Sequence, residues 1–314
     1  MRIVSLLPAA TEILLALGLG PDVVGVTELC ETPGFSPAEW MTVVARRPAG
    51  APASSGAETV EPAAPTGPRG EPGGEPLLVV DGEAMAAAEP DLVIVSDLRQ
   101  VCATGSREAR AMVAGFGREV DVLAIDAVTV EGVINAVQGV GAMTETEDEA
   151  MDVVIGLRER LAAVEAIVVG RRDRGFVAPR VGALGWLDQP YGTGWAVPEQ
   201  VRLAGGWELF GREGARPAPL GWDAVRDLDP EILVLMPQGH DLPGTMAAWL
   251  ALPRPDGWAD LAAVRAGRVF AVDAAAYFTH QGLRIVDGIE VLSELVDPLA
   301  FDGMAPPASW VRLG

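Results

Sequence analysis

The sequence predicts an α/β protein of two similar Rossmann-like lobes, each with a central parallel sheet, joined by one long α-helix. Three observations lead to this fold class. Short apolar runs alternate with helical patterns along the chain. Phrases of the first half return in the second half, and an amphipathic stretch lies between the two halves. A length of 314 residues is enough for two domains, each with its own core.

Four apolar runs in the first half predict strands. Each run is Leu-rich or rich in β-branched residues and is apolar on both faces, which suits a parallel sheet covered by helices on both sides. Pro8 ends the first run, and Thr11 is expected to cap the helix that follows it. The predicted strands are Arg2–Leu7, Val23–Val26, Leu92–Val95 and Val122–Ile125.

The second half repeats this plan. AEPDLVIVSD at Ala88–Asp97 returns as LDPEILVLMP at Leu228–Pro237. The first strands of the two halves, which begin at Arg2 and Arg180, are further apart than these two phrases, so the first lobe carries an insertion. Segment 45–76 accounts for it, because this segment is dense in Pro, Gly and Ala and has no hydrophobic periodicity. We expect it to form a loose loop.

A helix is predicted between the two lobes. In Glu145–Ala166 acidic residues come first and Arg residues follow, which matches the helix dipole, and apolar residues recur at helical spacing. The predicted division of the chain is therefore an N-terminal lobe at 1–143, a linking helix at 144–174 and a C-terminal lobe at 175–314.

The charge of the chain limits its partners. The formal net charge is −21, with 23 basic and 44 acidic residues, so nucleic acid and anionic membrane surfaces are excluded as expected partners. No apolar run is long enough to span a membrane, and we expect a monomer without membrane insertion. The N-terminus reads as a strand rather than as a signal peptide. This predicts a cytoplasmic protein, or a periplasmic or extracellular one if a presequence has been removed.

Aromatic residues follow the strands predicted for the second lobe. In open α/β lobes, ligands bind beyond the carboxyl ends of the strands. Both tyrosines of the chain, Tyr191 and Tyr277, fall in such segments, beside Trp186, Trp195 and Phe278. Aromatic side chains suit a large flat or amphipathic ligand. The alternative is that these rings pack the interface between the lobes.

Other chemistry has weaker signals. The chain has no GxSxG, no P-loop and no GxGxxG after its first strand, so we predict that it is not an enzyme and has no cofactor. Cys30 together with His240 or His280 leaves a thiol enzyme open as an alternative, and a disulfide between Cys30 and Cys102 also stays open. The same histidines leave a transition-metal site open, with oxygens from Glu12, Glu31 or Asp97, although no metal site is predicted.

Five motifs in order resemble the cobalamin-binding receptors of vitamin B12 ABC importers. They are RIVSLLPAATEILLALGLGPDVVGVT, DLRQVCATG, WLDQPYGTGWAVPEQVRLAGG, MPQGHDLPGT and RVFAVDAAAYFTHQGLRIVDG. ELCETP is similar to the segment that follows the second strand in this family, and the resemblance covers nearly the whole chain outside Ala45–Pro76. It implies the class III periplasmic-binding-protein fold, with a corrin ring held between the two lobes.

The resemblance also implies residue roles. Family receptors dock on their ABC permease through one acidic residue per lobe, and Glu108 and Asp223 lie near the matching positions. The expected function is to bind a cobalamin-like corrinoid, and the alternatives are a receptor for haem, a siderophore or a metal ion, or an enzyme that uses Cys30 and a histidine. The candidate ligand-binding residues are Pro8, Thr11, Glu31, Gln100, Trp186, Pro190, Tyr191, Trp195, His240, Tyr277, Phe278 and Arg284.

Overall fold

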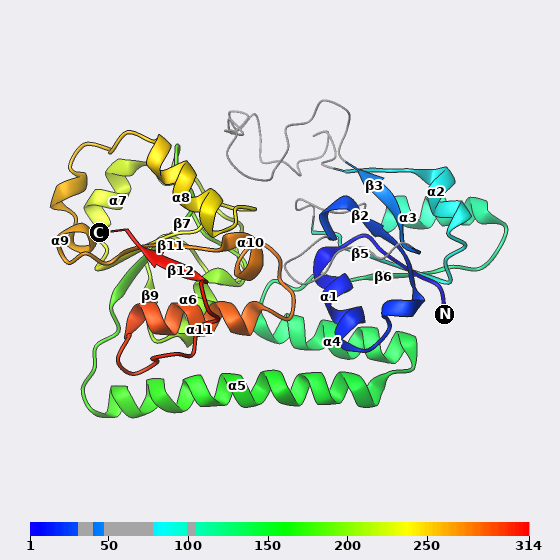
Figure 1. The fold of residues 1–314 in the computed structure, drawn as a ribbon, viewed down its shortest axis with the longest axis horizontal. Coiled ribbons are helices and arrows are strands. Elements are labelled where there is room, and N and C mark those ends of the chain that lie inside the picture. Colours follow the sequence, from blue (N-terminus) through cyan, green and yellow to red (C-terminus); the bar gives the residue numbers. More distant parts are fainter. Residues whose placement is uncertain (31–39, 47–77, 99–104, 314) are drawn as a thin grey trace. The chain divides into compact units, whose positions relative to one another are not determined.

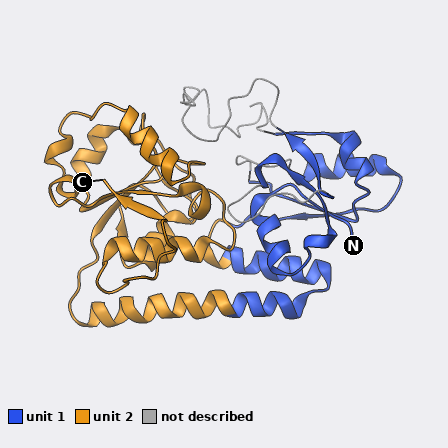
Figure 2. Cartoon of the chain, viewed as in Figure 1, with its two compact units in different colours: residues 1–53, 60–127, 132–155 blue, residues 54–59, 128–131, 156–314 orange. Residues whose placement is uncertain are grey.

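The computed structural model describes residues 1–30, 40–46, 78–98 and 105–313 (Figure 1). The chain forms two compact units, which are coloured separately in Figure 2. Unit 1 comprises residues 1–53, 60–127 and 132–155, and unit 2 comprises residues 54–59, 128–131 and 156–314. The predicted insertion 45–76 lies almost entirely outside the described residues.

Unit 1 contains a mostly parallel sheet of strand order β4-β3-β2-β1-β5-β6. Its pairs are parallel except for β3 with β4. The strands are β1 (Ile3–Ser5), β2 (Val23–Thr27), β3 (Thr42–Arg46), β4 (Val79–Val80), β5 (Leu92–Val95) and β6 (Asp121–Ala124). The helices are α1 (Pro8–Ala16), α2 (Gly82–Ala87), α3 (Ser106–Val113) and α4 (Val130–Thr144), with 3-10 turns η1 (Gly20–Asp22), η2 (Glu28–Cys30) and η3 (Ala114–Phe116).

The sequence signals for this sheet correspond to its centre. β1 and β5 are buried along their whole length, as their apolar runs predict. The expectation that Thr11 caps the first helix is wrong, because α1 begins at Pro8. Proline has a fixed φ suited to the first helical position and has no N–H that needs a partner there. Thr11 therefore lies inside the helix, where it is 1% exposed.

The long helix is α5 (Glu147–Asp173), and the boundary between the units falls within it. Glu147, Asp148 and Glu149 occupy its first turn, and it runs two turns past the amphipathic stretch that ends at Ala166, close to the end of the predicted linking helix at 144–174. It ends where Gly175 adopts a left-handed φ of 84° and Phe176 N donates to the Arg171 carbonyl over 3.1 Å. The Arg171 guanidinium stacks 3.4 Å from the Phe176 ring centre, so a cation–π contact secures this end of the helix.

Unit 2 contains a sheet of strand order β12-β11-β10-β7-β8, and β9 also pairs with β7. β7, β9, β10 and β11 run parallel, while β8 and β12 are antiparallel to their neighbours. The strands are β7 (Arg180–Trp186), β8 (Tyr191–Gly192), β9 (Trp207–Glu208), β10 (Ile232–Leu235), β11 (Val269–Val272) and β12 (Trp310–Arg312). The helices are α6 (Val197–Leu203), α7 (Trp222–Leu228), α8 (Leu242–Ala251), η4 (Trp258–Asp260), α9 (Ala262–Arg265), α10 (Ala274–Tyr277) and α11 (Ile285–Val296).

The internal repeat is visible in the pairing of the strands. The repeated phrases form β5 and β10, and each of these strands pairs in parallel with the first strand of its own unit, β1 or β7. Helices cover both faces of the unit 2 sheet, with α7, α8 and α9 on one side and α6 and α11 on the other (Figure 1). Two α/β units with parallel-rich sheets and a 27-residue helix confirm the predicted fold class.

Candidate functional site

The carboxyl ends of β1 and β5 meet at one edge of unit 1, where chain connections leave the sheet in opposite directions. At this edge Asp126 Oδ1 accepts hydrogen bonds from Ser96 Oγ at 2.9 Å, Asp97 N at 2.8 Å and Leu98 N at 3.0 Å. Asp97 in turn accepts from Ser106 Oγ and Ser106 N, and these two bonds lower the pKa of its carboxyl group. Asp97 therefore binds Ser106, the first residue of α3, and fixes the start of this helix.

A buried hydroxyl–thiol cluster lies beneath this edge. Thr11 Oγ1 lies within hydrogen-bond distance of Ser5 Oγ at 2.8 Å and of Cys30 Sγ at 3.2 Å, and Thr27 Oγ1 lies 3.3 Å from the same sulfur. Burial raises the pKa of the Cys30 thiol. A protonated, fully buried thiol is a poor nucleophile, which argues against an enzyme that uses Cys30.

The corresponding edge of unit 2 carries aromatic side chains. β7 ends at Trp186, and the chain turns back through Pro190 so that Tyr191 of β8 pairs with Trp186. Pro190 is buried, and its carbonyl accepts Leu220 N at 2.8 Å. The rings of Trp186 and Tyr191 are half-buried, so each keeps surface available to a ligand.

Two further strand ends join this edge. After β10, His240 N donates to the Pro237 carbonyl, and the backbone carbonyl of His240 accepts Ala275 N of α10 at 2.9 Å. Gly239 N donates to Thr279 Oγ1 over 2.9 Å. These bonds fix the loop that carries His240 against the segment that carries Tyr277 and Phe278.

Tyr277 and Phe278 form an aromatic pair at this edge. Their ring centres are 6.3 Å apart and their planes meet at 75°. Phe278 is buried and Tyr277 is half-buried, and the pKa of Tyr277 is raised, first by desolvation and then by the nearby carboxylates of Asp273 and Asp287. We call Trp186, Tyr191, His240, Tyr277 and Phe278 the aromatic edge of unit 2.

The other candidate residues lie as follows. Trp195 is half-buried with a left-handed φ of 55°, and its backbone bonds to Gly214 and Ala215. Arg284 is half-buried just before α11, and Pro8 is buried at the start of α1. Glu31 and Gln100, with Cys102, lie outside the described residues.

The metal alternative has little support in the geometry. Burial lowers the pKa of His280 to about 4, so this imidazole is neutral, which is the form that binds metals, but one imidazole needs further ligands to hold an ion. Within the described ranges, no group of three His, Cys, Asp or Glu side chains is placed to hold a metal ion.

The family can be assigned from the sequence together with this geometry. Residues 3–276 match the protein family described as periplasmic binding protein. The chain belongs to this family. Among curated proteins, a search by sequence finds no significant match.

Solved structures of periplasmic binding proteins share the fold over almost the whole chain. The vitamin B12 binding protein of Vibrio cholerae is 18% identical with a TM-score of 0.64, and the match covers 96% of this chain and 98% of that one. A heme binding protein from Pseudomonas aeruginosa is 20% identical with a TM-score of 0.67 and coverages of 95% and 92%. A protein from Staphylococcus epidermidis described as possibly iron-binding is 16% identical with a TM-score of 0.67 and coverages of 94% and 98%. The family and these neighbours are solute-binding proteins that differ in the ligand named for each.

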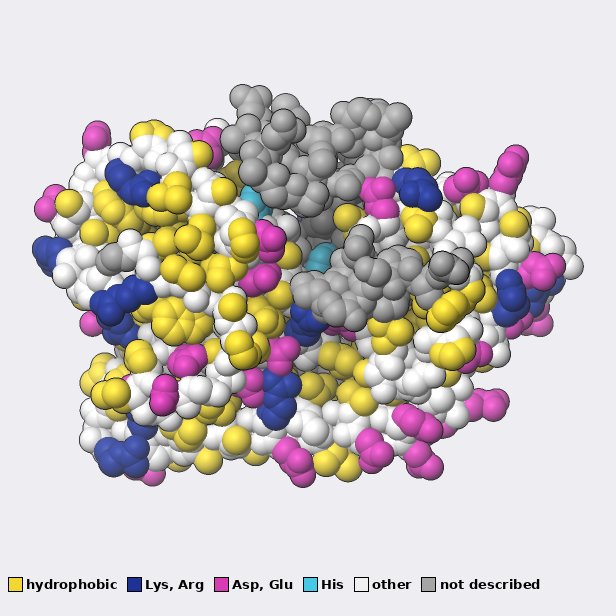
Figure 3. Space-filling view, in the orientation of Figure 1, with side chains coloured by type: hydrophobic (Ala, Val, Ile, Leu, Met, Phe, Trp, Pro, Cys, Tyr) yellow, Lys and Arg dark blue, Asp and Glu magenta, His cyan; other side chains and the backbone are white. Residues whose placement is uncertain are grey.

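Periplasmic binding proteins of ABC importers have a permease as partner, so the two predicted docking residues matter. Glu108 is exposed on α3 and forms an ion pair with Arg107 at 3.1 Å. Asp223 lies in the first turn of α7, where its side chain is 87% exposed and pairs with Arg226. Each unit thus presents one of the two acidic side chains on its surface. Figure 3 shows acidic side chains scattered over the face of each unit that it draws.

Sequence reasoning missed the residues that position the aromatic edge of this periplasmic binding protein. Gln200 is 1% exposed, and its Nε2 donates to the carbonyls of Ile285 at 2.9 Å and Tyr277 at 3.4 Å. Asp273, directly after β11, accepts Ala276 N and so caps the helix that ends at Tyr277. The position of Asp273 directly after an apolar strand could have indicated its role from the sequence. No feature of the neighbouring sequence indicates a role for Gln200.

Across the described residues, no helix combines the length and the apolar character required to cross a bilayer.

Proposed function

We propose that this chain is the ligand-binding receptor of an ABC importer, and that its ligand is a cobalamin-like corrinoid bound at the aromatic edge of unit 2. It acts by binding rather than by catalysis. The observation that carries the proposal is the gathering of half-buried Trp186, Tyr191 and Tyr277 with His240 at the strand ends where α/β proteins bind ligands. Family membership and the neighbour named for vitamin B12 support it.

The chemistry of the edge suits a large macrocycle. Aromatic rings bury a wide apolar area and lose little conformational entropy, and the phenol and indole groups offer polar atoms to amide-bearing side chains of the ligand. The hydrogen bonds between the His240 loop and the Tyr277 segment hold the edge in place before a ligand arrives. A preorganised site of this kind loses less free energy on binding.

Haem is a second candidate, favoured by a specific feature. His and Tyr are both side chains that ligate haem iron, and this edge offers His240, Tyr191 and Tyr277. Two further neighbours are named as periplasmic heme binding proteins, at 22% and 20% identity.

Titration of the purified protein with cyanocobalamin and, separately, with haemin tests the proposal. We expect saturable one-to-one binding of cyanocobalamin, measured by calorimetry, and an affinity that falls about 10- to 100-fold in Tyr277→Ala because a hot-spot ring is lost. Tyr277→Phe keeps the ring and should retain affinity to within a few-fold. Trp207→Ala is the matched control, since this exposed Trp of β9 pairs with Arg180 at the other end of β7.

The outcomes separate the two ligands. Haemin binding with a shift of its visible absorbance that is lost in His240→Ala, together with no cyanocobalamin binding, replaces the corrinoid by haem. An equal loss of affinity in Tyr277→Ala and Trp207→Ala would remove the aromatic edge as the site.

We also propose that the receptor works outside the cytoplasmic membrane, as the family name states for its members. The cytoplasmic alternative has no support from the family. Glu108 and Asp223 would then contact the permease, one from each unit.

Docking has a clear test. We expect Glu108→Ala and Asp223→Ala to leave ligand affinity unchanged in the purified protein and to reduce ligand uptake by cells that depend on this chain, most strongly in the double variant. Uptake at the unsubstituted rate in the double variant would contradict the docking role. Glu165→Ala is the control, because Glu165 is also an exposed acidic residue but lies on α5.

A further inference from the structure

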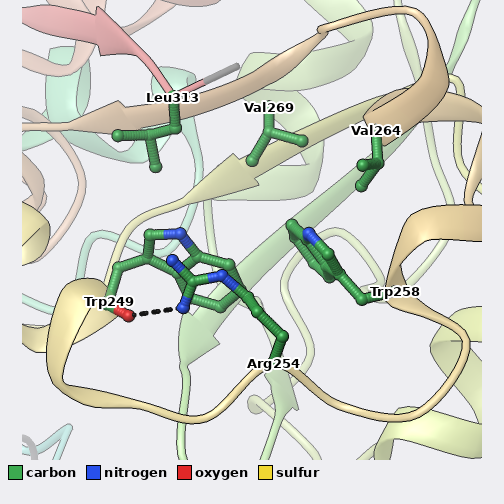
Figure 4. Close-up of a pocket in the computed structure, with 6 residues that line it drawn as sticks. All are labelled: Trp249, Arg254, Trp258, Val264, Val269 and Leu313. Atoms are coloured by element: carbon green, nitrogen blue, oxygen red, sulfur yellow. Dashed lines mark hydrogen bonds between the residues drawn. The ribbon is translucent and has the colours of Figure 1, made fainter.

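A cavity lies in unit 2, at the opposite end of the sheet from the aromatic edge. It is next to the start of β11 at Val269, whereas β11 leads at its other end towards Tyr277. Leu313 N donates to the Val269 carbonyl over 2.8 Å, which brings the residue after β12 to the same place. The cavity has a volume of about 140 Å³ and is lined by Trp249, Arg254, Trp258, Val264, Val269 and Leu313 (Figure 4).

Two tryptophans form most of its aromatic wall. The ring centres of Trp249 and Trp258 are 4.7 Å apart with planes at 48°, and Trp222 packs edge-on against Trp258 at 6.0 Å. Trp249 is 3% exposed, and Trp258 is half-buried. Together with Val264, Val269 and Leu313, the rings provide an apolar surface suited to a flat hydrophobic group.

Arg254 gives this cavity a positive charge. Its guanidinium carbon stacks 4.1 Å from the ring centre of Trp249, and its Nη1 donates to the carbonyls of Trp249 at 3.0 Å and Leu252 at 2.9 Å. Figure 4 shows the guanidinium over the Trp249 ring, beside Trp258. Two carbonyls and one ring thus hold the charged group in a single orientation.

Among the described residues, no side chain neutralises the charge of Arg254. No carboxylate of the described residues lies within ion-pair distance of it, and in the same part of the chain no acceptor binds its Nε or Nη2. Arg226 and Arg202, in contrast, are paired with Asp223 and Glu213. A fixed guanidinium with two unused donor groups beside an aromatic cavity matches the geometry of a carboxylate attached to a ring.

We propose that this cavity is a second ligand site, which binds a small aromatic carboxylate of one ring. The ring occupies the space between Trp258, Val264 and Leu313, and the carboxylate accepts hydrogen bonds from Arg254. The volume fits one ring, since an apolar protein cavity of about 150 Å³ binds benzene. The site is separate from the aromatic edge and does not depend on which ligand that edge binds.

Benzoate is the probe, and benzamide is the matched neutral ligand of the same shape. We expect saturable benzoate binding to the full chain, followed by calorimetry and by quenching of tryptophan fluorescence, and at least tenfold weaker binding of benzamide. In Arg254→Gln, benzoate should bind no better than benzamide. Because Arg254 is exposed, this substitution should leave the fold intact, which circular dichroism checks.

Two other variants make the test decisive. Val264→Phe, which places a ring in the cavity, should abolish benzoate binding, and Tyr277→Ala should leave it unchanged. The proposal is overturned if the unsubstituted protein shows no saturable benzoate binding, if Arg254→Gln binds benzoate as tightly as the unsubstituted protein, or if Tyr277→Ala removes the binding.

Discussion

Replacing Gly192 by alanine should lower the free energy of unfolding by about 3 kcal/mol, as overpacking against rigid structure does. Gly192 ends β8, directly after Tyr191 of the aromatic edge. A Cβ atom at this position would lie 2.1 Å from the carbonyl oxygen of Phe210 and 2.8 Å from its carbonyl carbon. Because both atoms belong to the backbone, no side-chain rotation relieves the clash, and β8 must move.

Ligand affinity should fall with stability, because a shift of β8 displaces Tyr191 from its pairing with Trp186. The measurement is urea denaturation at neutral pH, together with the cyanocobalamin titration under native conditions. Gly185→Ala is the matched control, since its Cβ would meet nothing closer than Thr193 Cγ2 at 3.7 Å. We expect it to change stability by less than about 0.5 kcal/mol. Equal stability of the two variants would show that β8 does not pack tightly against Phe210.

The buried carboxyl group of Glu208 should cause the free energy of unfolding to fall as the pH rises from weakly acidic to weakly basic values. Its Oε1 accepts Phe210 N at 2.9 Å and Ala183 N at 3.4 Å, while its Oε2 is buried with no partner among the described residues. Burial raises the pKa of this carboxyl from 4.5 to about 8. The native state therefore keeps a proton that the unfolded state releases above pH 4.5.

The direction of the effect follows from this difference. Between about pH 4.5 and pH 8 the native protein binds more protons at Glu208 than the unfolded chain, so each rise in pH favours unfolding. The contribution is complete below pH 4.5 and is lost by about pH 8, and its size is on the order of 5 kcal/mol.

Glu208→Gln tests this by removing the titration while keeping the shape of the side chain. The difference in unfolding free energy between the variant and the unsubstituted protein, measured by urea denaturation at pH 5 and pH 8, should shift by a few kcal/mol in favour of the variant at pH 8. Glu165→Gln, on the exposed face of α5, is the control and should leave this difference constant. A constant difference for Glu208→Gln as well would mean that Glu208 is ionised in the native protein.

The fold could be predicted because its signals are local and repeated. β5 and β10 are buried throughout, so their apolar runs stand out in the sequence, and the acidic start of α5 marks its beginning. The apolar pattern of α5 stops at Ala166, but the predicted linking helix at 144–174 reaches its end at Asp173, where Gly175 and the stacking of Arg171 with Phe176 terminate it. The start of α1 was misplaced because Thr11 resembled a cap, while the preference of Pro8 for the first turn decided the outcome.

The candidate site was predictable only in part. Rare tyrosines after strands pointed to Tyr191 and Tyr277, and the structure brings the segments of Trp186, His240 and Tyr277 to one edge. The sequence pattern could not indicate that Thr11 turns inwards to Ser5 and Cys30, because that depends on packing between strands far apart in the chain. The cavity beside Arg254 was equally hidden, since its walls come from α8, η4, α9, β11 and the residue after β12.

The bonds between the loop of His240 and the segment of Tyr277 have a kinetic consequence. The hydrogen bonds from Gly239 to Thr279 and from Ala275 to His240 join the two segments, so that they move together as one rigid unit. Neither segment has to become ordered before a ligand binds at the aromatic edge. Association rate constants should therefore be similar for ligands of similar size and charge. The protein would then discriminate between such ligands through their dissociation rates. The residence time of a ligand, rather than its rate of arrival, would decide which ligand is carried.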